Sequence, residues 1–176
     1  MFHNQHQKFP LINNLTKKYQ AGILEYKLDI PCLKLKGSHY KMGLQYGVLM
    51  KRKLEQVIKE LDTYKKNIKS SLPLYMTHFS HSIFKYKLHK FNHFLPSKFQ
   101  KELKAISEGS ELPYNKILFA LFGPELMSFS CTSIISQADK GLILGRNLDY
   151  SPIFLGNYPI IIEYNPETGN KYTSLG

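Results

Sequence analysis

The stretch that decides the fold reads Cys131-Thr-Ser-Ile-Ile-Ser-Gln-Ala-Asp-Lys-Gly-Leu-Ile-Leu-Gly-Arg-Asn-Leu-Asp-Tyr150. Two short apolar runs flank a polar Asp-Lys-Gly turn at residues 139–141, and this pattern predicts a β-hairpin. Such a hairpin would bring Cys131, at the start of its first strand, beside Arg146 and Asp149 at the end of its second. A thiol, a guanidinium and a carboxylate would then share one end of a sheet, where they could support nucleophilic chemistry.

Two motifs in this stretch, Cys131-Thr-Ser-Ile134 and Gly145-Arg-Asn-Leu-Asp-Tyr150, resemble those of the N-terminal-nucleophile cysteine hydrolases. The similar branch holds acid ceramidase, N-acylethanolamine acid amidase and the isopenicillin-N acyltransferase-like proteins, with the choloylglycine hydrolases as more distant relatives. Two upstream segments resemble the helical part that precedes the nucleophile in the acyltransferase-like branch: Gly37-Ser-His-Tyr-Lys-Met-Gly-Leu-Gln-Tyr-Gly47 and Glu102-Leu-Lys-Ala-Ile-Ser-Glu-Gly109. The resemblance runs in order from about residue 24 to residue 176.

The resemblance implies a fold and a reaction. The fold is α/β (α+β), an αββα N-terminal-nucleophile architecture with helices first and a mostly antiparallel sheet after them. The cysteine would cut the Ser130–Cys131 peptide itself, and its freed α-amine, with a reference pKa of about 7.7–8.0, would act as the base. The thiolate would attack the amide of an N-acyl compound and form an acyl-enzyme, which water or an amine acceptor releases. The expected partner is a small N-acyl amide or acyl donor, and no cofactor or metal is expected.

The resemblance also assigns roles to two charged residues. Asp149 would orient and balance the freed α-ammonium, and Arg146 would lower the pKa of the thiol and help to hold the substrate. Taken alone, the residues leave other interpretations open, because an internal cysteine is most often a small core residue. Arg146 and Asp149 could equally form a simple surface ion pair, and Asn147 fits a strand end better than a catalyst.

The predicted elements divide the chain into three parts. Residues 1–20 are expected to form a loose arm, residues 21–130 a strand and a helical region like a pro-segment, and residues 131–176 the start of the nucleophile-bearing β region. The sequence ends roughly 45 residues after Cys131, without the downstream layers and oxyanion-hole asparagine that the family would supply. We therefore expect a truncated member: a fragment, an inactive remnant, or one half of an enzyme that a second chain completes.

Periodicity predicts the individual elements. Alternation predicts a strand over residues 24–30, interrupted by Pro31 and resumed over 32–36 with Cys32 facing inward. Gly43 and Gly47, four apart in the first helix, would let another backbone approach closely, and Gly109 is expected to stop the third helix. Helices are predicted over about 39–69, 75–94, 97–107 and 113–122, and later strands over 131–136, 142–147, 159–164 and 171–175.

The formal net charge of +11 is concentrated in the front part of the chain. Before Cys131 there are 21 Lys and Arg against 9 Asp and Glu, and from Cys131 onward there are 3 against 4. Such a basic region could bind an acidic membrane surface weakly, although a well-solvated lysine-rich surface is the alternative. No RNA-binding motif, zinc finger or basic heptad array is present, so no nucleic acid is expected. The alternative function is thus an inactive, basic binding module for an acidic membrane or partner.

The remaining signals are weak. Residues 1–10 lack the apolar core of a signal peptide, no run of sequence could span a bilayer, and two cysteines make no disulfide framework, so we expect a cytoplasmic location. His78 with His81, and His89 with His93, have metal-ligand spacing but no carboxylate or cysteine beside them, which favours surface histidines. The segment from Ser38 to Lys41 fits a Ser-x-x-Lys pattern without its companion motifs.

Overall fold

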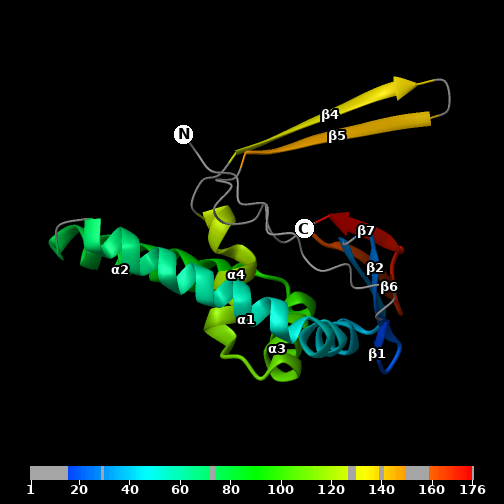
Figure 1. Cartoon of the computed structure of the whole chain (residues 1–176), viewed down its shortest axis with the longest axis horizontal. Coiled ribbons are helices and arrows are strands. Elements are labelled where there is room, and N and C mark those ends of the chain that lie inside the picture. The colour runs from blue at the N-terminus through cyan, green and yellow to red at the C-terminus, as the bar shows by residue number, and fades with distance from the viewer. Residues whose placement is uncertain are drawn as a thin grey trace.

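The computed structural model describes residues 16–28, 30–71, 74–126, 130–138, 141–149 and 159–175. Both helices and strands are present, in the order shown in Figure 1, so the chain is of mixed α and β structure. The strands are β1 (Lys17–Tyr19), β2 (Gly22–Lys27), β3 (Ile30–Gly37), β4 (Ser130–Ala138), β5 (Gly141–Asp149), β6 (Ile161–Pro166) and β7 (Tyr172–Leu175). The helices are α1 (His39–Ser71), α2 (Leu74–Phe94), α3 (Ser97–Ser110) and α4 (Tyr114–Leu126).

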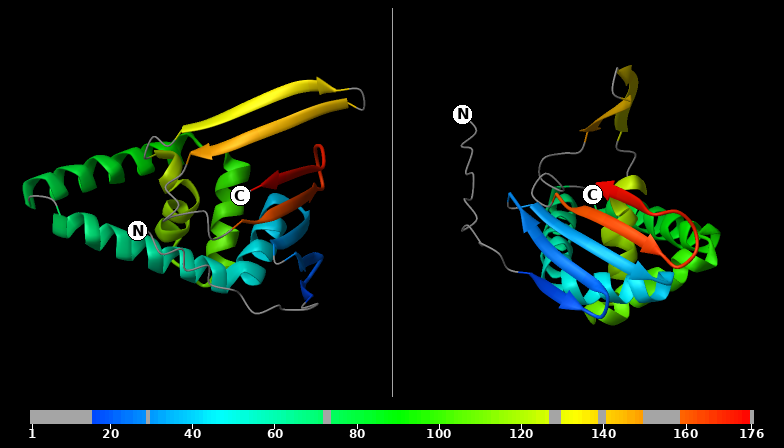
Figure 2. Two further views of the ribbon diagram at one scale, coloured as in Figure 1. Left: turned by 45° about the horizontal axis from the view of Figure 1, so that its top comes forward. Right: turned by 90° about the vertical axis from the view of Figure 1, so that its right-hand side faces the viewer.

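Five strands form one mixed sheet in the order β1-β2-β3-β6-β7. The pairing of β3 with β6 is parallel, with Leu33 opposite Ile162, and the other pairs are antiparallel. Strands that precede all four helices therefore share a sheet with strands that follow them, as Figure 2 shows. The predicted division after residue 130 is a boundary in the sequence, but this sheet combines strands from both sides of it.

Where we predicted a strand that is only interrupted at Pro31, the structure has two antiparallel strands, β2 and β3, with a turn between them. Leu28 lies in the turn between β2 and β3, where it is 97% exposed and has a φ of +48°. Pro31, the predicted interruption, instead lies within β3 opposite Tyr26. It is tolerated near the strand end because β6 pairs with β3 only from Cys32 onward. The apolar Leu28 had continued the alternation across the turn and so hid it.

Strand β1 lies within the stretch that was expected to be a loose arm. Residues 17–19 pair antiparallel with β2, with Lys18 opposite Ile23. Three residues are too few to show a period of two, which explains why this strand could not be predicted from the sequence. Residues 1–15 of the predicted arm lie outside the described residues.

The four helices occur in the predicted order, but the predicted end of α3 is wrong. Gly109 does not stop this helix, which continues to Ser110, and Glu111 then adopts the left-handed conformation with a φ of +58°. Gly109 is required for another reason, because a Cβ atom there would lie 2.6 Å from the carbonyl oxygen of Leu44 on α1. The same glycine that looked like a helix stop therefore belongs to a helix crossing.

The hydrophobic core lies between the five-stranded sheet and the helices. Leu33 and Leu35 of β3 are fully buried, as are Met42 of α1 and Ile117 of α4. Cys32 is also buried, at 3% exposure, as we predicted, on the face of β3 opposite to Leu33 and Leu35. Other buried apolar residues include Leu24, Leu49, Met50, Leu54, Ile58, Leu61, Leu103, Ile106, Leu118 and Ile162.

Strands β4 and β5 form a separate two-stranded sheet. Figure 1 draws this hairpin as a long ribbon apart from both the helices and the five-stranded sheet. Its existence and its two strands confirm the prediction made from the stretch that follows Cys131. None of the helices in the described ranges combines the length and the apolar character that a membrane span requires.

Candidate functional site

The β4–β5 ladder positions the residues that the sequence predicts to be catalytic. Cys131 pairs with Leu148, Ser133 with Arg146, and Ser130 with Asp149. In an antiparallel ladder, two residues directly opposite each other share a face, and so do residues two positions apart on one strand. Cys131 and Arg146 therefore belong to one face as diagonal neighbours, and such neighbours are about 7–8 Å apart in regular ladders. Asp149 belongs to the other face, directly across from Ser130.

The described part of the structure gives the backbone positions of these residues. The side chains of Ser130, Cys131, Arg146 and Asp149 lie outside it, as do residues 139 and 140 of the predicted turn. The backbone brings all four residues to one end of the hairpin, as expected. Their catalytic roles remain predictions.

The middle of strand β4 is strongly exposed to solvent. Ile134 is 65% exposed and Ile135 is 69% exposed, although they are consecutive and belong to opposite faces of the ladder. A strand with solvent on both faces gains little from apolar burial, so backbone pairing is its main support. This arrangement differs from that of β3, in which Leu33 and Leu35 are completely covered.

The two upstream segments that resemble the family pack against each other. A Cβ atom on Gly43 of α1 would collide with the carbonyl oxygen of Glu102 on α3, and one on Gly47 would collide with that of Ile106. The close approach that we predicted from the glycine spacing is confirmed, and α3 is the partner. Together with Gly109, these residues form the α1–α3 crossing, where the two helix backbones almost touch.

A polar pair closes one end of this crossing. The Nδ1 atom of His39, in the first turn of α1, lies 2.6 Å from Oε2 of Glu102, and both side chains are largely buried. The His39 ring also meets Phe99 edge to face, with 5.2 Å between the ring centroids. Burial raises the pKa of Glu102, and its hydrogen bond with His39 acts in the opposite direction. This pair could not be predicted from the sequence, because its members are 63 residues apart.

Tyrosines lie around the same crossing. Burial raises the pKa of Tyr46 to about 12, and burial is also the main reason why the pKa of Tyr164 is raised. Tyr164 stacks on Tyr172, with ring centroids 4.6 Å apart. These hydroxyl groups stay protonated at neutral pH, so they can act as hydrogen-bond donors rather than bases.

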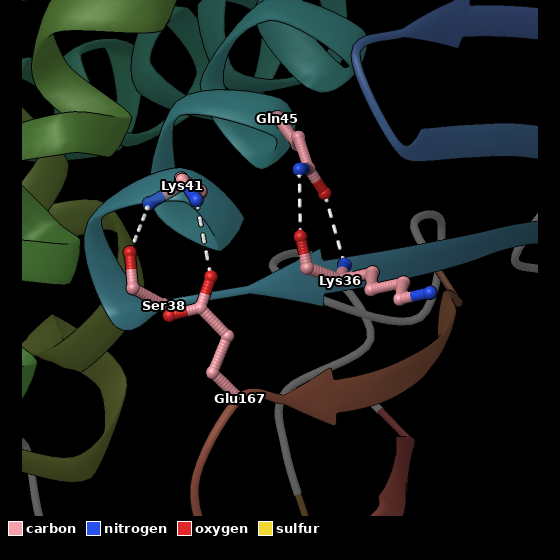
Figure 3. A network of polar contacts seen from close by, with 5 residues as sticks. All are labelled: Lys36, Ser38, Lys41, Gln45 and Glu167. Atoms are coloured by element: carbon pink, nitrogen blue, oxygen red, sulfur yellow. Dashed lines mark hydrogen bonds and ion pairs between the residues drawn. The ribbon is translucent and has the colours of Figure 1, made fainter.

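The Ser-x-x-Lys pattern proves to be a helix start. Ser38 Oγ accepts a hydrogen bond of 3.4 Å from the backbone N–H of Lys41, as an N-cap does, and Lys41 Nζ forms an ion pair of 3.1 Å with Glu167 (Figure 3). The lysine therefore points to a carboxylate and not to the serine hydroxyl. This arrangement supports a capping role for Ser38.

Gln45 ties α1 to the central strand. Its Nε2 donates to the Lys36 carbonyl at 2.9 Å, and the Lys36 N–H donates to its Oε1 at 3.0 Å (Figure 3). The register of β2 and β3 would place Lys36 across from Ala21, which precedes β2. The amide of Gln45 thus supplies the backbone partner that the sheet lacks at this point, and Gln45 is buried at 1% exposure.

Other candidate sites have little support. Among the described side chains, no group of three or more His, Cys, Asp or Glu could hold a metal ion, and the side chains of His78 and His81 lie outside that set. Two open depressions of about 420 and 430 Å³ occur in the described part of the surface. The first is lined by α1 and the start of α4, the second by Lys36, Gln45 and Glu167 with their neighbours, and neither is lined by the hairpin.

Comparison with known proteins identifies two similar proteins from Dictyostelium discoideum. Protein dcd1B is 27% identical over 182 aligned residues, which cover 90% of this chain and 36% of dcd1B. Protein dcd1A is 24% identical over 185 residues, which cover 90% of this chain and 40% of dcd1A. No protein-family model matches the sequence. The chain therefore spans little more than a third of the length of these two similar proteins.

Proposed function

We propose that this chain carries the nucleophile of a cysteine amidohydrolase or acyltransferase of the N-terminal-nucleophile type, related to acid ceramidase. The observation that carries the proposal is the register of the β4–β5 ladder. It puts Cys131 diagonal to Arg146 and puts Ser130 across from Asp149. This register supports the proposal because all four residues come to one end of the hairpin, with Cys131 and Arg146 on one face of the ladder and Ser130 and Asp149 on the other.

In this proposal, Arg146 and Asp149 have different roles. Arg146 belongs to the same ladder face as Cys131, which supports the proposed role of its guanidinium in favouring the thiolate and holding the acyl oxygen of the substrate. Asp149 is across from Ser130, beside the peptide bond to be cut. Its carboxylate therefore balances the α-ammonium that forms at the Cys131 nitrogen after cleavage.

The reaction begins with self-cleavage. The Cys131 thiol attacks the Ser130 carbonyl carbon, the peptide nitrogen leaves with a proton, and the resulting thioester is hydrolysed by water. This step produces a Ser130 carboxylate and a free α-amine on Cys131. Because such an amine has a reference pKa of about 7.7–8.0, it can accept the thiol proton near neutral pH.

The processed site then acts on an N-acyl amide. The thiolate attacks the amide carbonyl carbon, the C–N bond breaks, and the α-ammonium returns a proton to the departing amine. The acyl group remains on sulfur as a thioester until water, in a hydrolase, or an amine acceptor, in an acyltransferase, takes it. We propose that this reaction takes place in the cytoplasm, the location expected from the sequence.

The deciding experiment is the intact mass of the protein purified from its natural source, under denaturing and reducing conditions. We expect two pieces that divide between Ser130 and Cys131. The Cys131→Ala variant should remain a single piece, whereas Cys32→Ala should divide normally, since it removes the other thiol from a buried position in β3. An undivided protein that hydrolyses an N-acyl amide equally well with and without Cys131 would contradict the proposal.

A second candidate function has a different observation behind it. The described part of α2 carries several lysines and exposed apolar residues, which favours binding to an acidic surface. This binding does not require Cys131, and the next subsection develops it.

A further inference from the structure

Helix α2 has an unusual composition for an exposed helix. Its 21 residues include Lys85, Lys87 and Lys90 but no Asp or Glu. Among the described residues, no carboxylate pairs with these three lysines, and all three are exposed. An ordinary solvated helix mixes both signs of charge, so this helix presents a positive potential with which none of the described carboxylates pairs.

One face of α2 packs onto the rest of the protein. Leu88 contacts the hydrophobic core, and the Phe91 ring lies 4.8 Å from that of Phe122 on α4. On the same face, the side-chain oxygen of Asn92 accepts a 2.6 Å hydrogen bond from the Tyr114 hydroxyl. These contacts fix the rotation of the helix, and therefore determine which residues face away from the protein.

The opposite face carries exposed apolar residues. At 100° per residue, Tyr86, Lys90 and His93 lie opposite to Leu88 and Phe91. Ile83, Phe94 and Lys87 lie toward one flank, and Lys87 is only about 40° from Phe91. These six residues form the outer face of α2. Ile83 is 40% exposed, Tyr86 is 63% exposed and Phe94 is 71% exposed. From Ile83 to Phe94 the stripe is about 16 Å long, at 1.5 Å per residue. Large apolar groups along a helix face without a cover indicate a contact surface.

The charged and apolar groups of this face interleave. The Lys90 ammonium lies 6.0 Å from the centre of the Tyr86 ring, and the rings of His93 and Phe94 meet edge to face at 5.6 Å. Figures 1 and 2 show α2 running along the helical part of the molecule, away from the five-stranded sheet. The five-stranded sheet therefore does not cover α2.

We propose that the outer face of α2 docks on an anionic lipid surface, with Ile83, Tyr86 and Phe94 at the headgroup boundary and Lys87 and Lys90 on the acidic headgroups. Interfacial helices combine an apolar stripe with lysines in this way. A nucleic acid would need stacking rings and basic residues alone, and it would leave the aliphatic Ile83 in water. The proposal does not depend on the proposed catalytic function.

The test is co-sedimentation of the full protein with vesicles of phosphatidylcholine, with and without phosphatidylserine. We expect binding to the vesicles that contain phosphatidylserine, and a steep loss of binding as salt increases. Each lysine near such a surface contributes roughly a factor of five in affinity, so Lys87→Gln with Lys90→Gln should weaken binding about 25-fold. Phe94→Ser with Tyr86→Ser should also weaken it, and the loss should persist at high salt.

A matched control separates the face from overall charge. Lys18→Gln with Lys27→Gln removes the same two charges from exposed positions on β1 and β2 and should leave vesicle binding within about twofold. Circular dichroism verifies that each variant is folded. Equal losses in the α2 and control pairs would overturn the proposal, because binding would then follow net charge. Tight binding to single-stranded RNA that survives Phe94→Ser with Tyr86→Ser, without vesicle binding, would also overturn it.

Discussion

The β3 strand and the β4 strand carry similar amounts of aliphatic side chain, yet they are supported in different ways. In β3, Leu33 and Leu35 are at most 1% exposed and lie under α1, and both neighbouring strands are paired. In β4, Ile134 and Ile135 are more than half exposed, and β5 is the paired neighbour in the described structure. The difference teaches that the stability of the protein is concentrated in the five-stranded sheet and the α1–α3 crossing. The predicted nucleophile lies on a hairpin that is supported mainly by the backbone pairing of its two strands.

Truncation of a buried residue in β3 should have the largest effect. Leu33→Ala removes a fully buried side chain from the central strand, and we expect it to lower the free energy of unfolding by about 3–5 kcal/mol. Urea unfolding followed by circular dichroism measures this change. A loss below about 1 kcal/mol would mean that the sheet does not carry the stability that its burial implies.

The glycines of the α1–α3 crossing come next. Gly47→Ala improves helix propensity by roughly 1 kcal/mol, but its methyl group would meet the backbone of α3 at Ile106. We expect a net loss of about 2–3 kcal/mol in thermal or urea unfolding, because neither backbone can yield. Lys104→Ala on the exposed side of α3 serves as the control, and it should change stability by less than about 0.5 kcal/mol.

Loss of the Gln45 amide should have a somewhat smaller effect. Gln45→Ala leaves both the N–H and the carbonyl of Lys36 without the partners that complete the sheet there. We expect about 2 kcal/mol of destabilisation, with faster hydrogen exchange at the Lys36 amide than at the Leu33 amide. An unchanged rate of hydrogen exchange at the Lys36 amide in Gln45→Ala would show that water replaces the hydrogen bonds of the Gln45 side chain with no loss of stability.

The pH dependence of the crossing gives a signed prediction. Since burial raises the pKa of Glu102, the protonated carboxyl is favoured in the folded protein, and this contribution is lost as pH rises through the raised pKa. The stability of wild type relative to Glu102→Gln should therefore fall as pH increases across that range.

Glu111 provides the opposite case, because Lys51 lowers its pKa. The free energy of unfolding of wild type should therefore increase relative to that of Glu111→Gln as pH rises through the lowered pKa. Urea unfolding at several pH values can verify this.

The smallest effect is expected in the hairpin. Ile135→Ala truncates an exposed side chain, so the free energy of unfolding should change by less than about 0.5 kcal/mol. The comparison with Leu33→Ala is direct, because both changes shorten an aliphatic residue in a strand. If Ile135→Ala costs as much as Leu33→Ala, the hairpin is covered in the protein as isolated, and the contrast between the two strands fails.

Much of the local structure could be predicted from the sequence, whereas the long-range contacts could not. The spacing of Gly43 and Gly47 predicted a close backbone approach but could not identify Glu102 and Ile106 as the groups approached. The hairpin after Cys131 was predictable because its two strands are joined by a short polar turn. The parallel pairing of β3 with β6 was not, because the partners are more than 120 residues apart and periodicity is a local signal.

The candidate site shows the same limit. Ladder positions of Cys131, Arg146 and Asp149 follow from a local hairpin, so residue patterns could place them at one end of a sheet. The pair formed by His39 and Glu102 depends on how α1 crosses α3, and no pattern within either segment encodes that geometry. Gly109 was misread for the same reason, since a glycine near a helix end serves equally well as a stop or as a contact.

The parallel pairing of β3 with β6 would join two separate polypeptides if the chain were cut after Ser130. One polypeptide would then hold β1 to β3 with all four helices, and the other would hold β6 and β7, which complete the same sheet. Separating the two would break a ladder of six residue pairs and expose the buried Ile160 and Ile162 to water. The cleaved molecule would thus persist as a heterodimer whose subunits are joined through the interior of a sheet.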